Sequence, residues 1–218
     1  MAFASGWFGM VQQFATINLL SFLFVALAPS FGMGSIAASL IGSKIGCANV
    51  TAAKYYYRSA MIVQLMIAIG ECTLLSAWML ILVDRVTDSK DLQAQLESVY
   101  SLFVLNVFLD SMRAMLKGVL RGVGIQNTVL PYHILLQGMV LPGAMYGLAF
   151  TEIIEEPNVG VWAAVSIVDG LLMLAYWGRV LNSDWHEISI KVIKRTNKIA
   201  GQVQDEEELL KQPGRSEH

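Results

Sequence analysis

The chain begins with a long stretch that contains no charged side chain. From Met1 to Ser43 there is no Asp, Glu, Lys or Arg. A helix rises about 1.5 Å per residue across roughly 30 Å of hydrocarbon, so this stretch is about twice as long as one membrane span. We expect one long helix from about Trp7 to Ile41, bent at Pro29, whose ring removes a backbone hydrogen bond. Two shorter helices separated at Pro29 are the alternative.

The composition indicates a membrane protein. Hydrophobic residues make up 55% of the chain and charged residues 15%, with a mean hydropathy of +0.54. Soluble domains carry about 25% charged residues. A chain of 218 residues has room for about five spans of roughly 20 apolar residues each. We therefore predict an all-α polytopic membrane helix bundle. The predicted spans are residues 7–41, 57–83, 98–116, 128–150 and 160–181.

The charges between the spans predict an orientation. Lys and Arg dominate after the first, third and fifth spans, whereas the connectors at 84–97 and 152–156 are rich in acids. Because basic loops are retained in the cytoplasm, we expect a non-cytoplasmic N-terminus and a cytoplasmic C-terminus. Residues 182–218 would form a cytoplasmic tail, amphipathic at first and disordered from Gln204 onward. A start without a cytoplasmic flank is typical of the later part of a longer membrane protein.

Several ionisable residues lie within the predicted spans, where they are costly and tend to mark an ion or substrate pathway. The strongest candidate is Asp110, with Asn106 one turn earlier as a second ligand. Glu71 is either part of a cation path or a protonated or hydrogen-bonded structural carboxyl. Asp169 serves either helix packing or a water-filled cavity. His133 could relay a proton, since the ordinary pKa of histidine is roughly 6.5, although it lies near the predicted cytoplasmic end of its span.

Other classes of function lack a sequence signal. No nucleophile is paired with a base, no histidine cluster has metal-ligand spacing, and no glycine-rich nucleotide loop is present. Cys47 and Cys72 fit no disulfide framework and are expected to be small hydrophobic side chains. The formal net charge of −2 provides no basic patch for a nucleic acid. We predict that the chain is not an enzyme and uses neither a metal nor an organic cofactor.

Four stretches resemble a known transporter family. The segment LDSMRAMLKGVLRGVGIQ is similar to the signature of the multidrug and toxic compound extrusion (MATE) antiporters. The matching residues are Asp110, Gly118, Val119, Arg121, Gly122, Gly124 and Gln126. The stretch from Ser39 to Lys54 resembles the family's R-V-G-N-x-L-G-A-G-N loop, since it keeps Gly42, Gly46 and Asn49 but has Leu40 in place of the Arg. Val140 to Phe150, with Pro142, and Gly160 to Trp162 resemble two further helix motifs. The order and sidedness of these stretches match the last five of the family's twelve helices, in its C-terminal lobe.

The resemblance implies a two-lobed helical exporter that couples H⁺ or Na⁺ entry to the efflux of organic cations and other xenobiotics across the lipid bilayer. Asp110 matches an acid implicated in cation binding, and Arg121 with its neighbouring glycines would shape a helix junction. The coupling ion would be H⁺ or Na⁺, and the resemblance implies no cofactor. The unit would work with a separate N-terminal lobe or by self-association. The alternative is a non-transporting membrane protein, a truncated relic of such a transporter.

Two positions depart from the family signature. Arg113 stands where the family has Gln, and Lys117 stands where it has Ser. On a helix, Asp110 and Arg113 are i,i+3 neighbours, and a nearby guanidinium favours the charged carboxylate. Asp110 is therefore either a coupling site or one half of an ion pair that anchors the helix.

Overall fold

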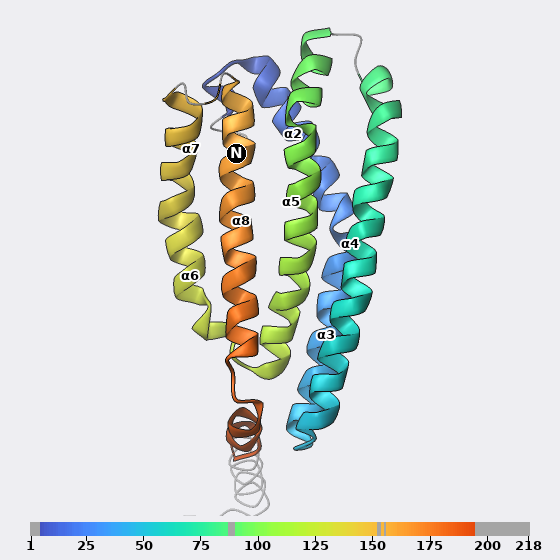
Figure 1. Ribbon diagram of the computed structural model, residues 1–218, viewed down its shortest axis with the longest axis vertical. Helices are drawn as coiled ribbons and strands as arrows, with labels where there is room; N and C mark the ends of the chain where they lie inside the picture. Colours follow the sequence, from blue (N-terminus) through green and yellow to red (C-terminus); the bar gives the residue numbers. More distant parts are fainter. Residues whose placement is uncertain (1–4, 87–89, 152–153, 155, 195–218) are drawn as a thin grey trace, which may run out of the picture.

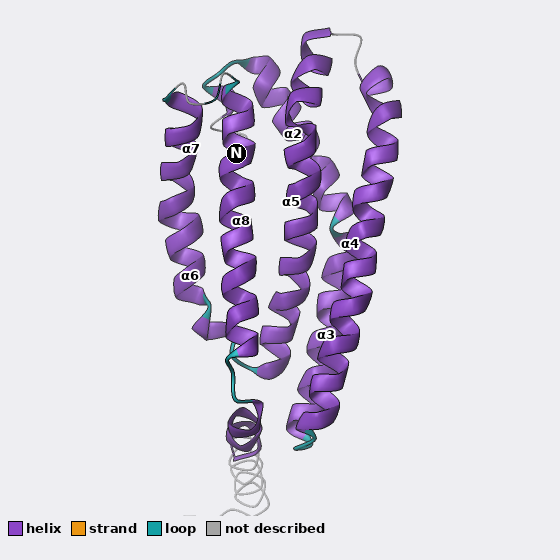
Figure 2. Ribbon diagram, in the orientation of Figure 1, coloured by secondary structure: helices purple, strands orange, loops and turns teal. Residues whose placement is uncertain are grey.

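The computed structural model describes residues 5–86, 90–151, 154 and 156–194. In this part of the chain every regular element is a helix (Figure 2). Five helical segments are long and apolar enough to cross a membrane. The predicted all-α bundle of about five membrane helices is therefore confirmed. The predicted disorder from Gln204 onward lies outside the described residues.

The first segment is a bent pair of helices, α2 (Met10–Ala26) and α3 (Ala28–Gly46), which crosses obliquely behind the other helices (Figure 1). The two helices are separated at Leu27, and Pro29 occupies the first turn of α3. A proline is tolerated there, but its missing N–H breaks the ladder of an uninterrupted helix. The amide of Leu27 donates to the Leu23 carbonyl, and that of Phe31 donates to the Leu27 carbonyl. These bonds keep α2 and α3 joined as one bent span.

The next two spans are longer than the apolar sequence alone predicts. α4 runs over Val50–Val86 and α5 over Lys90–Val123. Helical hydrogen bonding continues into their polar ends because the end groups of a helix can be capped. Asn49 caps α4, since its Oδ1 accepts a hydrogen bond from the Ala52 amide at 3.0 Å. Asp91 in the first turn and Arg121 in the last turn of α5 complement the helix dipole.

The fourth span is irregular. A short 3₁₀ turn, η1 (Gln126–Thr128), leads into α6 (Leu130–Leu135), the π-helical turn η2 (Leu136–Val140) and α7 (Leu141–Phe150). Pro142 has no N–H for the carbonyl of Gly138, and the wider π turn lies directly before it. The last span is α8 (Pro157–Leu181), which begins with proline at its first position.

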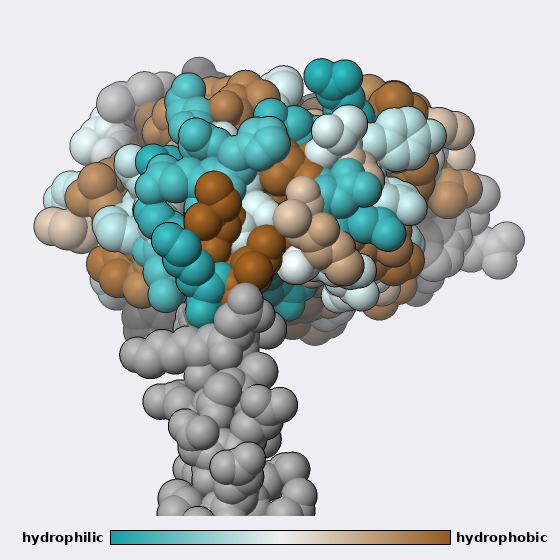
Figure 3. Space-filling view, turned by 90° about the horizontal axis from the view of Figure 1, so that it is seen from below, coloured by the Kyte–Doolittle hydropathy of each residue, from teal (hydrophilic) through white to brown (hydrophobic). Residues whose placement is uncertain are grey.

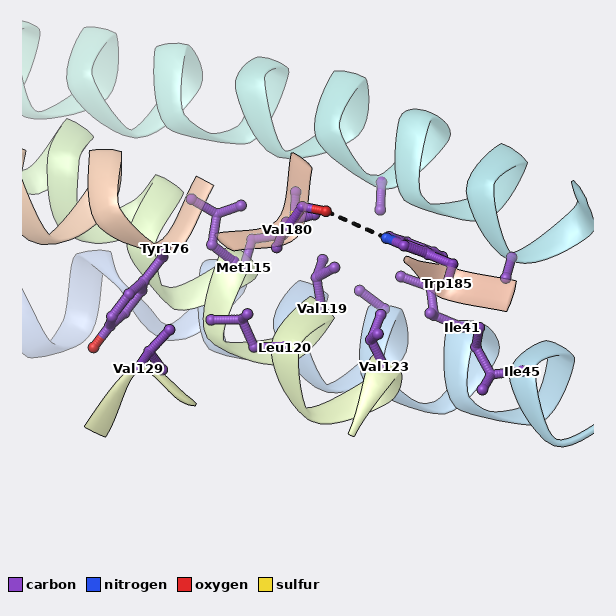
Figure 4. Packing of buried hydrophobic residues seen from close by; sticks show 14 of the residues in the cluster. Ile41, Ile45, Met115, Val119, Leu120, Val123, Val129, Tyr176, Val180 and Trp185 are labelled. Atoms are coloured by element: carbon purple, nitrogen blue, oxygen red, sulfur yellow. Dashed lines mark hydrogen bonds between the residues drawn. The ribbon is translucent and has the colours of Figure 1, made fainter. Parts of the chain in front are cut away.

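The central helix is α5, which contacts α2, α3, α4 and α8. Two hydrophobic clusters surround it. One contains Phe103 of α5 and Trp162 of α8, whose rings meet edge to face at 5.6 Å. The other lies between α3, α4, α5 and α8 and includes Met115, Val119 and Tyr176 (Figure 4). The packing positions therefore come from helices far apart in the sequence.

Residues 185–194 form a further helix at the lower end of the bundle (Figure 1). Trp185 is only 4% exposed, packs against Tyr57 at 5.8 Å and donates through Nε1 to the Val180 carbonyl at 3.3 Å (Figure 4). Ser189 donates to the Ile45 carbonyl at 2.8 Å. The ring therefore lies against the bundle and not among lipid head groups. Its ring is part of the protein core.

The helix ends with basic residues gather at one end of the molecule. The carboxyl ends of α3, α5 and α8 and the start of α4 lie at the lower end in Figure 1. Seen from below, this end shows many hydrophilic residues (Figure 3). The basic residues on these segments are Lys44, Lys54, Arg58, Arg121 and Arg179.

Candidate functional site

Arg113 lies between two buried carboxylates. Its Nη2 binds Oδ1 of Asp110 on the same helix, and its Nη1 binds Oδ1 of Asp169 on α8. The exposed fractions of the three side chains are 11%, 12% and 5%, respectively. Both readings of Asp110 drawn from the sequence placed it beside Arg113. The structure adds a second acid, Asp169, whose pairing with Arg113 no sequence pattern indicated.

Two amide side chains complete this group. Asn106, one turn before Asp110 on α5, donates through Nδ2 to Oδ2 of Asp169 at 3.1 Å. Gln137, in the π-helical turn η2, donates to Oδ1 of Asp169 at 3.4 Å. We call these residues the Arg113 cluster: Asn106, Asp110, Arg113, Gln137 and Asp169. Three helical segments therefore place their polar side chains at one point inside the bundle.

The charges of the Arg113 cluster are unevenly matched. One guanidinium serves two carboxylates, so the fully ionised cluster has a net charge of −1. The next cation on α5, Lys117, forms no ion pair within 4 Å with any acid in the described part of the chain and instead lines a cleft. A guanidinium can pair fully with one carboxylate. Arg113 can therefore neutralise Asp169 while Asp110 takes up another cation, or the reverse.

Glu71 belongs to a separate polar group. Ser30 of α3 donates to its carboxylate, at 3.0 Å from Oε1 and 3.2 Å from Oε2, and Ser111 of α5 also donates to Oε2. Gln64 donates through Nε2 to Ser30 Oγ at 2.8 Å. Among the described residues, no hydrogen bond or ion pair joins this group to the Arg113 cluster. We call Ser30, Gln64, Glu71 and Ser111 the Glu71 cluster.

The partners of Glu71 were missed by sequence reasoning. Serine in an apolar helix often donates to a carbonyl of its own helix, as Ser21 does to Ile17 and Ser35 does to Phe31. Nothing in the sequence distinguishes Ser30 from those residues. The only available signal was that Ser30, Glu71 and Ser111 are polar residues within predicted spans.

His133 lies apart from both clusters. Its Nδ1 is 3.2 Å from the hydroxyl of Tyr176 on α8. Both side chains line a cleft of about 530 Å³ that also includes Lys117 and Arg121 of α5. No carboxylate lines this cleft in the described part of the chain. The structure thus places His133 among bases, away from the predicted acids.

The glycines of the signature shape helix contacts and a helix end. An added Cβ at Gly122 would lie 2.7 Å from the Ala38 carbonyl of α3, so α5 and α3 approach backbone to backbone. Gly124 follows α5 with φ at +83°, a conformation that favours glycine. The amide of Ile125 donates to the Leu120 carbonyl and that of Gly124 to the Arg121 carbonyl, as in a Schellman cap.

The ligand types in these groups do not favour a metal centre with several acidic or imidazole ligands. Among the described residues, no three His, Cys, Asp or Glu side chains come together closely enough to hold a metal ion. The Arg113 cluster holds two carboxylates and the Glu71 cluster holds one.

Comparison with solved structures identifies a similar fold. A crystal structure of the eukaryotic MATE transporter AtDTX14 matches with a TM-score of 0.78 at 17% sequence identity. The match covers 85% of this chain and 41% of the AtDTX14 chain. The chain thus spans less than half the length of that transporter. No curated protein matches the chain.

Comparison with family models gives a match at the level of sequence. The model of the MatE family matches residues 6–151, which include α2 to α7. Asp110, Arg113 and the glycine-rich end of α5 lie inside this match, whereas Asp169 on α8 lies beyond it. The match covers more than half of the sequence and agrees with the arrangement of the membrane helices. The chain is therefore an integral, multi-pass membrane protein that belongs to the MatE family of transporters.

Proposed function

We propose that this chain takes part in the antiport of organic cations and that the Arg113 cluster is its ion-coupling site. One observation carries the proposal: a single guanidinium is shared by two buried carboxylates, Asp110 and Asp169, from neighbouring helices. An ionisable group inside a membrane protein is costly and is typically found in an ion or substrate pathway. Because two acids share one base, uptake of a proton by one acid leaves the base paired with the other.

The coupling would operate by exchange. When Asp110 takes up a proton, Arg113 pairs with Asp169 alone, and the three side chains become neutral together. When the proton leaves, the net charge of −1 returns and favours the binding of a cationic substrate nearby. Binding of one cation and loss of the other are then linked because both depend on the same negative charge. No covalent chemistry is required.

The geometry favours H⁺ over Na⁺ as the coupling ion. A bound Na⁺ needs several oxygen ligands, but Arg113 already occupies Oδ1 of both acids, and Asn106 occupies Oδ2 of Asp169. A proton needs only one carboxylate oxygen. Within the described residues, Asp110 Oδ2 has no hydrogen bond or ion pair, so it is the atom that we assign to the proton.

The transport unit would contain more than one copy of this fold or a separate N-terminal lobe. Alternating access requires two bundles that move about a shared site. Large apolar side chains on α4 and on α6 to α7 are exposed, including Met66, Met139 and Tyr146. Such faces suit lipid or a second bundle. We place the end with the basic residues in the cytoplasm, following the retention of Lys and Arg on that side.

Transport from reconstituted vesicles tests this function. The vesicles would contain the protein and a fluorescent organic cation, and efflux would be followed after a pH gradient or a Na⁺ gradient is imposed. We expect efflux that depends on the pH gradient and is lost in Asp110→Asn and in Asp169→Asn. Glu187→Gln, at an exposed position outside the spans, is the matched control for the removal of a carboxylate. Efflux that is unchanged in both aspartate variants would remove the cluster from the mechanism.

A non-transporting membrane protein is the second candidate. The observation that favours it is the ion pair between Asp110 and Arg113, which would stabilise the bundle even without transport. In that case the vesicles would show no gradient-driven efflux, and the only effect of Asp110→Asn would be a lower stability of the protein.

A further inference from the structure

The Glu71 carboxylate is buried without a basic partner. Glu71 is 8% exposed, and within the described part of the chain its oxygens accept hydrogen bonds only from serine hydroxyls. The ion pairs in that part of the chain do not include it. Arg113, by contrast, supplies a base to both acids of its cluster. Hydroxyl donors orient a carboxylate but leave its negative charge uncompensated.

Glu71 also lines a cleft whose other described lining residues are apolar. A cleft of about 530 Å³ runs between the α2–α3 bend and α4, and Glu71 is the one ionisable side chain among its described lining residues. The apolar lining residues that matter here are Phe22, Ala26, Pro29, Leu74, Leu75 and Ala77. On one side of the bend at Leu27 and Pro29, α3 packs against α4, and the cleft lies where α2 turns away from α4.

We propose that this cleft binds a lipophilic organic amine, with the protonated nitrogen on Glu71 and the apolar body against Phe22 and Leu74. The charge of such a ligand complements the lone carboxylate, and its hydrocarbon complements the apolar walls. Ser30 and Ser111 donate hydrogen bonds to the carboxylate, and the Glu71 side chain also lines the cleft. A neutral lipid chain would match the walls but would leave the charge without a partner.

The site is separate from the Arg113 cluster. Ser111 and Asp110 are adjacent on α5 but point to different groups, toward Glu71 and toward Arg113. The inference deepens the proposed transport function, since it gives the substrate a place of its own beside the coupling acids. Binding at Glu71 can nevertheless be measured without transport, so a failure of one proposal does not imply a failure of the other.

Equilibrium binding to the full chain in lipid nanodiscs tests the site. The probe is naphthylethylamine, which is charged at neutral pH, and the matched neutral probe is its N-acetyl derivative. Signal from empty nanodiscs is subtracted. Glu71→Gln keeps the shape of the side chain and removes its charge. A hydrogen bond to a charged group contributes about 1.5–3 kcal/mol, so we expect this variant to bind the amine roughly 10- to 100-fold more weakly.

A second variant tests the cleft without touching the carboxylate. Ala26→Phe fills the space beside Pro29 and should also abolish binding, whereas Leu65→Phe, on the exposed surface of α4 outside the cleft, should leave it unchanged. The proposal is overturned if Glu71→Gln binds the amine as tightly as the unmodified chain. It is also overturned if Ala26→Phe binds the amine as tightly as the unmodified chain, or if the N-acetyl derivative binds equally well, which would indicate an apolar or lipid site.

Discussion

Gly34 of α3 and Gly118 of α5 meet backbone against backbone. A Cβ added at Gly118 would overlap the Gly34 carbonyl oxygen, and one added at Gly34 would lie 2.8 Å from the Ala114 carbonyl oxygen. Real Cβ atoms do not approach a backbone oxygen so closely. The same two helices approach at Gly42 and Gly122, where the corresponding distance from a Gly42 Cβ to the Gly122 oxygen is 3.3 Å. This contact fixes α5, which carries Asp110 and Arg113, against α3.

Gly118→Ala should therefore destabilise the bundle. Overpacking of a close contact costs about 1–3 kcal/mol or more, and a backbone carbonyl cannot move aside as a flexible side chain can. The measurement is thermal unfolding of the purified protein in detergent. Gly147→Ala is the matched control because Gly147 lies within α7 and an added Cβ meets nothing within 4 Å. It should gain up to about 1 kcal/mol from helix propensity. Equal melting temperatures for the two variants would contradict the contact.

The Arg113 cluster predicts a non-additive pair of substitutions. Arg113→Gln leaves Asp110 and Asp169 buried without their base, and loss of one partner from a buried ion pair costs about 3–5 kcal/mol. Adding Asp169→Asn removes one of the stranded charges and should restore part of the lost stability. Unfolding of the two single variants and the double variant measures this coupling.

An exposed ion pair supplies the control for that cycle. Lys191 and Glu187 pair at 2.6 Å with exposed fractions of 71% and 62%, so Lys191→Gln should cost no more than about 1 kcal/mol. If Arg113→Gln were as mild as Lys191→Gln, or if Asp169→Asn added its own full cost to that of Arg113→Gln, the shared ion pair would be refuted.

The membrane fold could be predicted from sequence because hydropathy and helix length act along the chain. The uncharged start, the apolar spans and the signature of α5 each need only local information. Helix ends were less predictable. The apolar pattern suggested a span starting near Tyr57, but Asn49 caps α4 and lets the helix begin at Val50. A capped helix can continue past the end of the apolar stretch from which a membrane span is predicted.

The candidate sites were predicted only in part because their partners lie far apart in sequence. Helical spacing alone predicts that Asn106, Asp110 and Arg113 lie close together, because all three belong to α5. The pairing of Arg113 with Asp169 depends on the contact between α5 and α8, which no local pattern reports. The serines beside Glu71 were invisible for the same reason, and Gln137 reaches Asp169 from a π-helical turn that the sequence indicated only through Pro142.

Ala48 lies at a position where replacement by glycine should stabilise the protein. It follows α3 with φ at +57°, and the Asn49 amide donates to the Lys44 carbonyl across this turn. A left-handed conformation costs a residue with a Cβ roughly 1–2 kcal/mol relative to glycine. Ala48→Gly should therefore raise the stability by about 1 kcal/mol in thermal unfolding. Ala52→Gly, within the first turn of α4, should instead lower it, and a gain in both variants would refute the argument.

Asp184 gives the helix at 185–194 a pH-dependent start. The amides of Glu187 and His186 donate to its Oδ1 at 3.2 Å and 2.9 Å, and these two bonds lower the pKa of Asp184 below its ordinary value. A carboxylate whose pKa is lowered in the folded state stabilises that state above its unfolded pKa of about 3.9. This contribution is lost as the pH falls through the lower, folded value, because protonation removes the acceptor charge.

The cap therefore predicts how the helix at 185–194 responds to substitution and to pH. At neutral pH, Asp184→Ala should speed hydrogen exchange at the amides of His186 and Glu187, whereas Asp184→Asn should preserve part of their protection because its side-chain oxygen still accepts a hydrogen bond. Glu187→Gln controls for the loss of a negative charge in the same turn. Trp185 and Ser189 hold this helix on the bundle independently of Asp184, so the effect should stay confined to its first turn. Unchanged exchange in Asp184→Ala, or equal exchange in all three variants, would show that the Asp184 carboxylate does not cap the helix.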